Sequence, residues 1–90
     1  MKRYTDVMGK PLTKEDVTRT VKIILKSDDP QPFVLVRNMK IGFGKAVRLL
    51  SVLHHGNVIT GPETSPRTVI LKDETQAINA ALRQLKKGRK

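Results

Sequence analysis

The residues with the clearest chemical potential in this sequence are polar and basic side chains spaced for one side of a helix. Lys45 directly follows Gly44, and Arg48, Ser51 and His55 come next at intervals of three or four residues. Lysine and arginine commonly donate hydrogen bonds to base edges in the major groove of DNA, and a glycine at a helix start lets backbone N–H groups approach a phosphate. The pattern predicts a helix that binds a polyanion.

The charge of the chain agrees with such a partner. Its 90 residues include 18 Lys and Arg against 8 Asp and Glu, which gives a formal net charge of +10. Residues 31–62 contain no acid, and their bases are Arg37, Lys40, Lys45 and Arg48. A second basic run closes the sequence at residues 86–90. A counter-charged partner would therefore meet the middle and the end of the chain.

The sequence gives little support for thiol chemistry, metal binding or membrane insertion. The absence of cysteine excludes disulfides, cysteine-ligated zinc and a thiol nucleophile. His54 and His55 are adjacent, so on a helix they point about 100° apart and do not readily share a metal ion. We expect no enzyme activity, no metal and no cofactor. No apolar run approaches the roughly 18 residues of a membrane span, so we expect no membrane partner and a cytoplasmic protein, nucleoid-associated or, for a viral protein, in the host cytoplasm.

The elements that would position these residues can be read from periodicity. A helix is expected over residues 14–26, because Thr13 and Asp16 have capping-box spacing and Leu12 and Val17 have hydrophobic-staple spacing. Its apolar stripe ends before Asp28-Asp29-Pro30. Residues 33–39 suit either a strand or a short helix, and Pro32 favours a helix start.

The next helix is expected over residues 43–55. We predict an apolar face of Phe43, Ala46, Val47, Leu50 and Leu53, and an opposite face of Gly44, Lys45, Arg48, Ser51 and His55. Gly56-Asn57 can end this helix, because either residue tolerates the left-handed conformation. The helix therefore has a core side and a basic side.

A hairpin and a final helix complete the chain. Residues 58–60 and 68–71 are β-prone and flank a turn-rich segment at 61–67, which predicts a hairpin. Asp73 and Gln76 then suit a helix start, and the stripe that follows consists of Ala77, Ile78, Ala81, Leu82 and Leu85. That stripe either packs on the domain, which is the commoner outcome, or forms a homodimer interface.

The expected fold is mainly α with a small β-hairpin: a winged helix-turn-helix plus an additional C-terminal helix. We expect a flexible basic arm at 1–11, the winged helix-turn-helix domain at 12–72, the C-terminal helix at 73–86 and a basic tail at 87–90. The helix at 43–55 would enter the major groove. Arg37 and Lys40 would contact the DNA backbone, and Arg67 in the hairpin would reach sugar-phosphate or a minor groove.

Two stretches resemble one known family. The run Arg37-Asn38-Met39-Lys40-Ile41-Gly42-Phe43-Gly44-Lys45-Ala46-Val47-Arg48-Leu49-Leu50 is similar to the helix-turn-helix of the gamma domain of FtsK-type DNA translocases, and residues 61–71 resemble the wing of that domain. The resemblance, which covers roughly residues 14–71, implies a winged helix that reads short oriented duplex sequences. It also implies that Lys45 and Arg48 match basic recognition-helix positions and that Arg67 matches the wing arginine. A phosphate-cradling motor loop is absent from the sequence.

We therefore expect a protein that binds double-stranded DNA and regulates transcription, or DNA segregation or processing. The alternative is an interaction module that binds an acidic protein surface, such as that of a polymerase or a DNA motor. Leu49 and Val52, which the helical pattern sets beside the basic face, favour this alternative. RNA binding ranks third, because aromatic residues make up only 3% of the chain and base stacking needs them.

Overall fold

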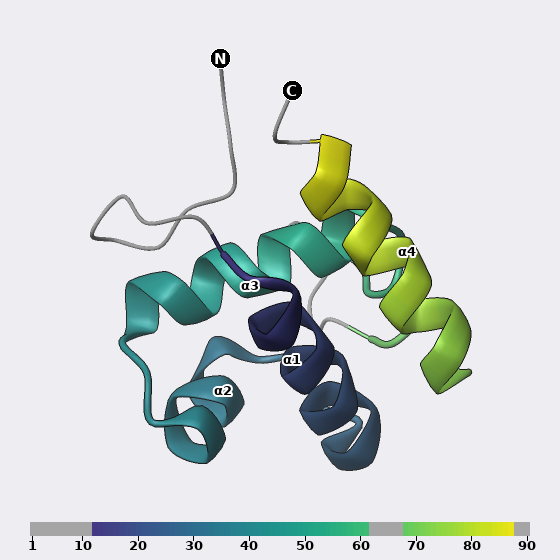
Figure 1. Cartoon of the computed structure of the whole chain (residues 1–90). Helices are drawn as coiled ribbons and strands as arrows, with labels where there is room; N and C mark the ends of the chain where they lie inside the picture. The colour runs from purple at the N-terminus through teal and green to yellow at the C-terminus, as the bar shows by residue number, and fades with distance from the viewer. Residues whose placement is uncertain (1–11, 62–67, 88–90) are drawn as a thin grey trace.

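A computed structural model of the chain describes residues 12–61 and 68–87 (Figure 1). This part is a small all-α domain of four helices: α1 (Lys14–Ser27), α2 (Pro32–Met39), α3 (Phe43–His55) and α4 (Glu74–Lys87). The helices agree in order and nearly in bounds with those expected from the sequence. The arm expected at 1–11, the hairpin segment at 62–67 with Arg67, and residues 88–90 of the expected tail lie outside the described residues.

Helix α1 begins at the predicted capping box. The backbone N–H of Asp16 donates to Thr13 Oγ1 at 3.0 Å, and the backbone N–H of Thr13 donates to Asp16 Oδ2 at 3.3 Å. These two bonds satisfy N–H groups that a helix start leaves without a partner. The helix ends at Asp28, whose backbone is left-handed with φ 56° and whose N–H donates to the carbonyl of Ile24 at 2.8 Å.

Residues 32–39 form a helix, which settles the ambiguity in this segment. Pro32 occupies the first turn of α2, where its missing N–H costs nothing. The helix ends at Lys40, which is left-handed with φ 55° and donates its N–H to the carbonyl of Val36 at 3.0 Å. A turn of residues 40–42 then leads into α3, with Gly42 as the N-cap residue.

The C-terminal end of α3 requires a glycine for a reason that the sequence does not reveal. Gly56 has φ −87°, so Asn57, with φ 62°, is the residue that adopts the left-handed conformation. A Cβ on Gly56 would lie 3.0 Å from the carbonyl oxygen of Ala80 in α4. Gly56 therefore permits a close approach of the end of α3 to the backbone of α4.

The predicted faces of α3 need a correction. Phe43 and Val47, expected in the core, are 63% and 39% exposed, whereas Leu49 and Val52, expected beside the basic face, are completely buried. Helix α3 contacts α1, α2 and α4, so three neighbours decide which side is buried. The apolar residues of α3 occupy more than half of the circumference of the helix. The neighbouring helices cover the part of that circumference that contains Leu49 and Val52.

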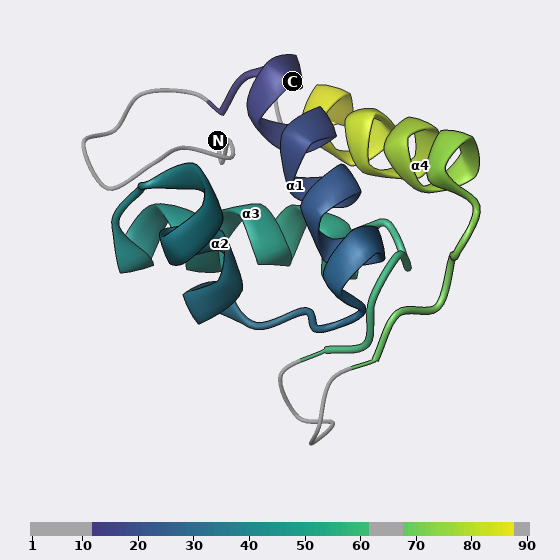
Figure 2. The same cartoon turned by 90° about the horizontal axis from the view of Figure 1, so that it is seen from below.

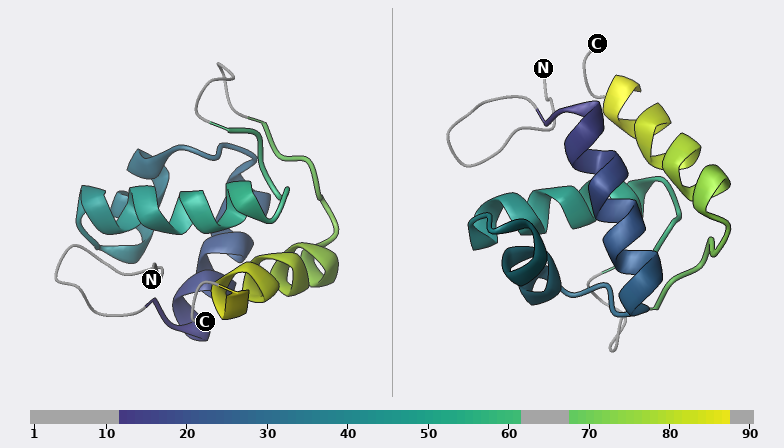
Figure 3. Two further views of the ribbon diagram at one scale, coloured as in Figure 1. Left: turned by 90° about the horizontal axis from the view of Figure 1, so that it is seen from above. Right: turned by 60° about the horizontal axis from the view of Figure 1, so that its bottom comes forward.

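The helices are arranged around α1. Helix α1 contacts each of the other three, and α3 contacts both α2 and α4, but α2 and α4 do not contact each other. Figures 1 and 2 accordingly show α2 and α4 on opposite sides of α1, and the right view of Figure 3 shows α1 crossing α3 between them. The core between the helices includes Val17, Val21, Ile24, Leu35, Leu50 and Leu53, all fully buried.

Helix α4 packs on the domain, which is the commoner of the two outcomes expected for its apolar stripe. Its N–H at Gln76 donates to Asp73 Oδ1 at 2.9 Å, which confirms the expected cap. Ala77, Ala81 and Leu85 are buried in the core, and Ile78 and Leu82 pack partly buried against it. The stripe is thus covered by α1 and α3 of the same chain.

The predicted hairpin corresponds to one isolated antiparallel bridge in the described residues, between Ile59 and Val69, and no strand is formed in these ranges. The N–H of Thr60 donates to the carbonyl of Thr68 at 3.0 Å, and that of Ile70 donates to the carbonyl of Val58 at 2.7 Å. The two segments belong to the connection from α3 to α4 and run side by side near the C-terminal end of α3 (Figure 3, left). Separately, none of the helices in the described ranges has the length and apolar character needed to cross a bilayer.

Candidate nucleic-acid interface

The candidate interface is built on α2, the turn at 40–42 and α3. The start of α3 has no side-chain cap and no acid among the residues of its first turn, so no side chain accepts a hydrogen bond from its first N–H groups. Lys40 and Gly42 are exposed in the turn. A Cβ on Gly42 would meet no atom within 4 Å, so the space beside this residue is open.

Four of the predicted contact residues lie along the side of α3 that does not face the core. Arg48 and His55 are exposed, and Gly44 and Ser51 are partly exposed. Arg48 Nη1 donates to the carbonyl oxygen of Gly44 at 3.2 Å, which holds the guanidinium beside the first turn of the helix. The ring of His55 lies 5.3 Å, centroid to centroid, from that of His54. The structure thus brings Gly44, Arg48, Ser51 and His55 together.

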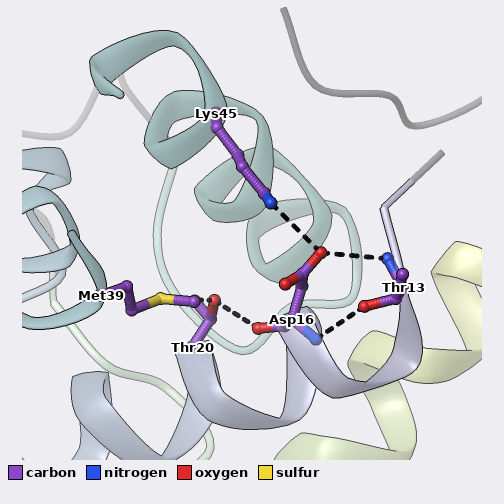
Figure 4. A network of polar contacts seen from close by, with 5 residues as sticks. All are labelled: Thr13, Asp16, Thr20, Met39 and Lys45. Carbon is purple, nitrogen blue, oxygen red and sulfur yellow. Dashed lines mark hydrogen bonds and ion pairs between the residues drawn. The ribbon is translucent and has the colours of Figure 1, made fainter. Parts of the chain in front are cut away.

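Lys45 differs from these residues because it is directed toward α1. Its Nζ lies 3.5 Å from Asp16 Oδ2, and the two side chains are only 25% and 22% exposed (Figure 4). Such an incompletely buried pair is worth at most about 1 kcal/mol. Its main effect is therefore geometric: Lys45 ties the first turn of α3 to the first turn of α1.

The same network reaches α2 (Figure 4). The hydroxyl of Thr20, a fully buried residue, donates to the carbonyl oxygen of Asp16 at 2.7 Å and also lies 3.6 Å from the sulfur of Met39 at the end of α2. Through Asp16 and Thr20, α1 thus contacts the end of α2 and the start of α3, which are the two sides of the turn. These contacts fix how α3 is presented.

The predicted backbone contacts on α2 are available at the surface. Lys40 is exposed, and so is Arg37, whose guanidinium carbon lies 5.3 Å from the ring centroid of Phe33. Cation–π contacts of this kind contribute about 0.5–1 kcal/mol at exposed sites. Phe33 thereby orients the Arg37 side chain and leaves it accessible.

The chain segments that form the turn and its neighbours carry cations and no acids, and the acid that reaches them is Asp16 of α1, which pairs with Lys45. Residues 30–61 and 68–72 contain no Asp or Glu, and their bases are Arg37, Lys40, Lys45, Arg48 and Lys72. An excess of cations over acids raises the local positive potential and attracts polyanions. Within the described residues, no group of three or more His, Cys, Asp or Glu side chains could hold a metal ion.

Sequence reasoning missed two residues on this face, Phe43 and Val47, which it assigned to the core. An alternative apolar face of Ala46, Leu49, Leu50 and Leu53 has equally good helical spacing. This second face was the sign in the sequence that Phe43 and Val47 could lie outside the core. Comparison of the chain with known protein families, with curated proteins and with solved structures found no match. The resemblance to the gamma domain of DNA translocases therefore rests on residues 37–50 and 61–71 themselves.

Proposed function

We propose that this protein binds double-stranded DNA, with α3 in the major groove and α2 and the turn against the sugar-phosphate backbone. The observation that carries the proposal is the outer side of α3, which is solvent-accessible, contains Arg48 and follows a short turn in a stretch without acids. An α-helix fits the major groove, where each base pair presents a distinct pattern of donors and acceptors.

Each residue of the interface has a role in this proposal. Arg48 donates to the O6 and N7 acceptors of a guanine, while Ser51 and His55 contact neighbouring base edges. The N–H groups at the start of α3, near Gly44, bind a phosphate. Arg37 and Lys40 contact further phosphates and fix the register of the helix. Lys45 orients α3 on α1 through Asp16 and supplies positive charge.

The winged form of the motif is part of the same proposal. The segments that meet at the Ile59–Val69 bridge would continue as a hairpin, whose Arg67 contacts sugar-phosphate or a minor groove. A regulator of transcription, or of DNA segregation or processing, would use such a domain. The resemblance to the gamma domain supports this form.

The alternative, an interaction module for an acidic protein, now depends on different residues. Leu49 and Val52 no longer support it, because both are completely buried. Phe43 and Val47 do, because they expose apolar area beside a basic surface, as in many protein interfaces. The positive charge of the chain favours both DNA and an acidic protein as partners, so binding assays must distinguish the two functions.

Titration of a labelled duplex followed by fluorescence anisotropy tests the proposal. We expect a log-log dependence of the association constant on salt with a slope of about −4 to −5, if about five phosphates are neutralised. The preferred duplex is obtained by selection from a random library. A chain that binds no duplex at moderate salt, or that binds with no salt dependence, would refute the proposal.

A pair of charge-matched variants tests the role of α3. Arg48→Ala should cost about 1–3 kcal/mol on the preferred duplex and little on a random one. Arg83→Ala removes the same charge from an exposed position on α4, outside the helix-turn-helix, and should have a small effect that is equal on both duplexes. Equal losses for Arg48→Ala on both duplexes would exclude base reading by this residue.

A further inference from the structure

The exposed apolar side chains of α3 have a specific place on the proposed interface. Phe43 is 63% exposed and Val47 is 39% exposed, whereas Ala46, Leu49, Leu50, Val52 and Leu53 in the same helix are completely buried. Phe43 and Val47 are four residues apart and are therefore neighbours on the helix surface. They form one apolar patch at the first turns of α3, next to the turn that starts the helix.

This patch adjoins the polar residues of the interface. Gly44 and Ser51 are three or four residues from both Val47 and Arg48, so on the helix surface they lie between these two side chains and connect them into one surface. The guanidinium of Arg48 is held beside the same first turn by its bond to the Gly44 carbonyl. A ligand of this surface must therefore offer apolar groups and hydrogen-bond acceptors within a few ångströms of each other.

The major groove of DNA meets this requirement at thymine. The C5-methyl group of thymine is the apolar group that a base pair presents there, and it lies beside the O4 acceptor and next to the N7 and O6 acceptors of a neighbouring guanine. The absence of acids from residues 30–61 and 68–72 favours a polyanionic ligand over a neutral apolar one.

We propose that Phe43 and Val47 read thymine methyl groups in the major groove, and that the preferred duplex carries thymine next to the guanine bound by Arg48. This inference rests on the proposed function and deepens it, because it assigns part of the sequence preference to two residues. The contribution is specific: burying one methyl group against an apolar side chain is worth about a fourfold change in affinity.

Replacement of thymine by deoxyuridine tests the inference, because it deletes the methyl group and keeps every hydrogen-bonding atom. Each thymine of the selected duplex is replaced in turn, and binding is measured by anisotropy. We expect one or two positions at which wild-type binding weakens about threefold to fivefold. In Val47→Ala or Phe43→Ala, the same replacement should have almost no further effect.

Phe33→Ala is the matched control, because Phe33 on α2 is also a phenylalanine and also 63% exposed. This variant should keep the full sensitivity to deoxyuridine, whatever its overall affinity. Since Phe43, Val47 and Phe33 are exposed, all three variants should fold, and thermal denaturation followed by circular dichroism verifies this.

The unfavourable outcomes are distinguishable. If the duplex binds with sequence preference but no deoxyuridine replacement matters, or if the penalty persists in both Val47→Ala and Phe43→Ala, the inference is wrong and the proposed function stands. If no duplex binds, the proposed function fails and the inference fails with it. If an acidic leucine-containing peptide binds more tightly than any duplex and Val47→Ala abolishes that binding, the patch is a protein-docking site and the inference is overturned.

Discussion

Substitution of Gly56 by alanine gives a quantitative test of how α3 and α4 fit together. The new Cβ would lie 3.0 Å from the carbonyl oxygen of Ala80, 3.2 Å from its carbonyl carbon and 3.3 Å from Cγ of Gln84. The Gln84 side chain can rotate away, but the Ala80 contacts are to helix backbone. Helix α4 must therefore move by a few tenths of an ångström.

Two opposing effects decide the sign of the change in stability. Overpacking of this kind costs about 1–3 kcal/mol. Replacing glycine by alanine also restricts the unfolded chain, which stabilises the fold by about 0.4–1 kcal/mol, and the φ of −87° at Gly56 lets alanine adopt the native backbone without strain. Overpacking outweighs the entropic gain, so Gly56→Ala should lower the free energy of unfolding by about 1 kcal/mol, or the Tm by roughly 4–8 °C.

Urea and thermal denaturation followed by circular dichroism measure this change. Gly42→Ser is the matched control, because Gly42 has β-region backbone and a Cβ added there would have no atom within 4 Å. Serine there also supplies the missing cap of α3, so this variant should gain about 0.5–1 kcal/mol. A Gly56→Ala protein as stable as the wild type would refute the inferred close approach of α3 and α4.

Four variants test other parts of the structure. Leu49→Ala should destabilise the fold by about 2–5 kcal/mol and Val47→Ala by less than about 0.5 kcal/mol in urea denaturation, and the reverse order would contradict the corrected faces of α3. Thr13→Ala should cost about 1 kcal/mol in the same assay, because it removes the cap of α1, and no loss would argue against the capping box. Lys40→Gly should relieve left-handed backbone that costs a lysine about 1–2 kcal/mol, yet weaken DNA binding and make the salt slope less negative by about 1. A Lys40→Gly protein whose salt slope is unchanged would exclude a phosphate contact at this position.

The sequence predicts helices better than it predicts their orientation. The start of α1 follows from Thr13 and Asp16, because capping is a local interaction between residues close in the chain. The buried side of α3 is not local: Leu49 and Val52 are buried by packing against other helices, and nothing within residues 43–55 specifies that choice. The exposure of Phe43 and Val47 follows from the same packing.

In the candidate site, too, local features can be predicted from the sequence and contacts between helices cannot. The run of cations without acids is visible in the sequence, and so is their spacing on α3. The pairing of Lys45 with Asp16 is not, because it joins residues of two helices whose relative position depends on the whole core. That pair separates Lys45 from Arg48, although spacing alone predicts the same role for both.

The packing of α1 against α4 bears on the order in which the chain folds. Contacts between α2 and α3 join neighbouring helices across a short turn, whereas α1 and α4 are the first and last helices. Their docking must close the longest loop of the domain, and the entropy cost of closure grows with loop length. We therefore expect α4 to dock late in folding and to detach first under mild denaturant, so that its amide hydrogens exchange before those of α3.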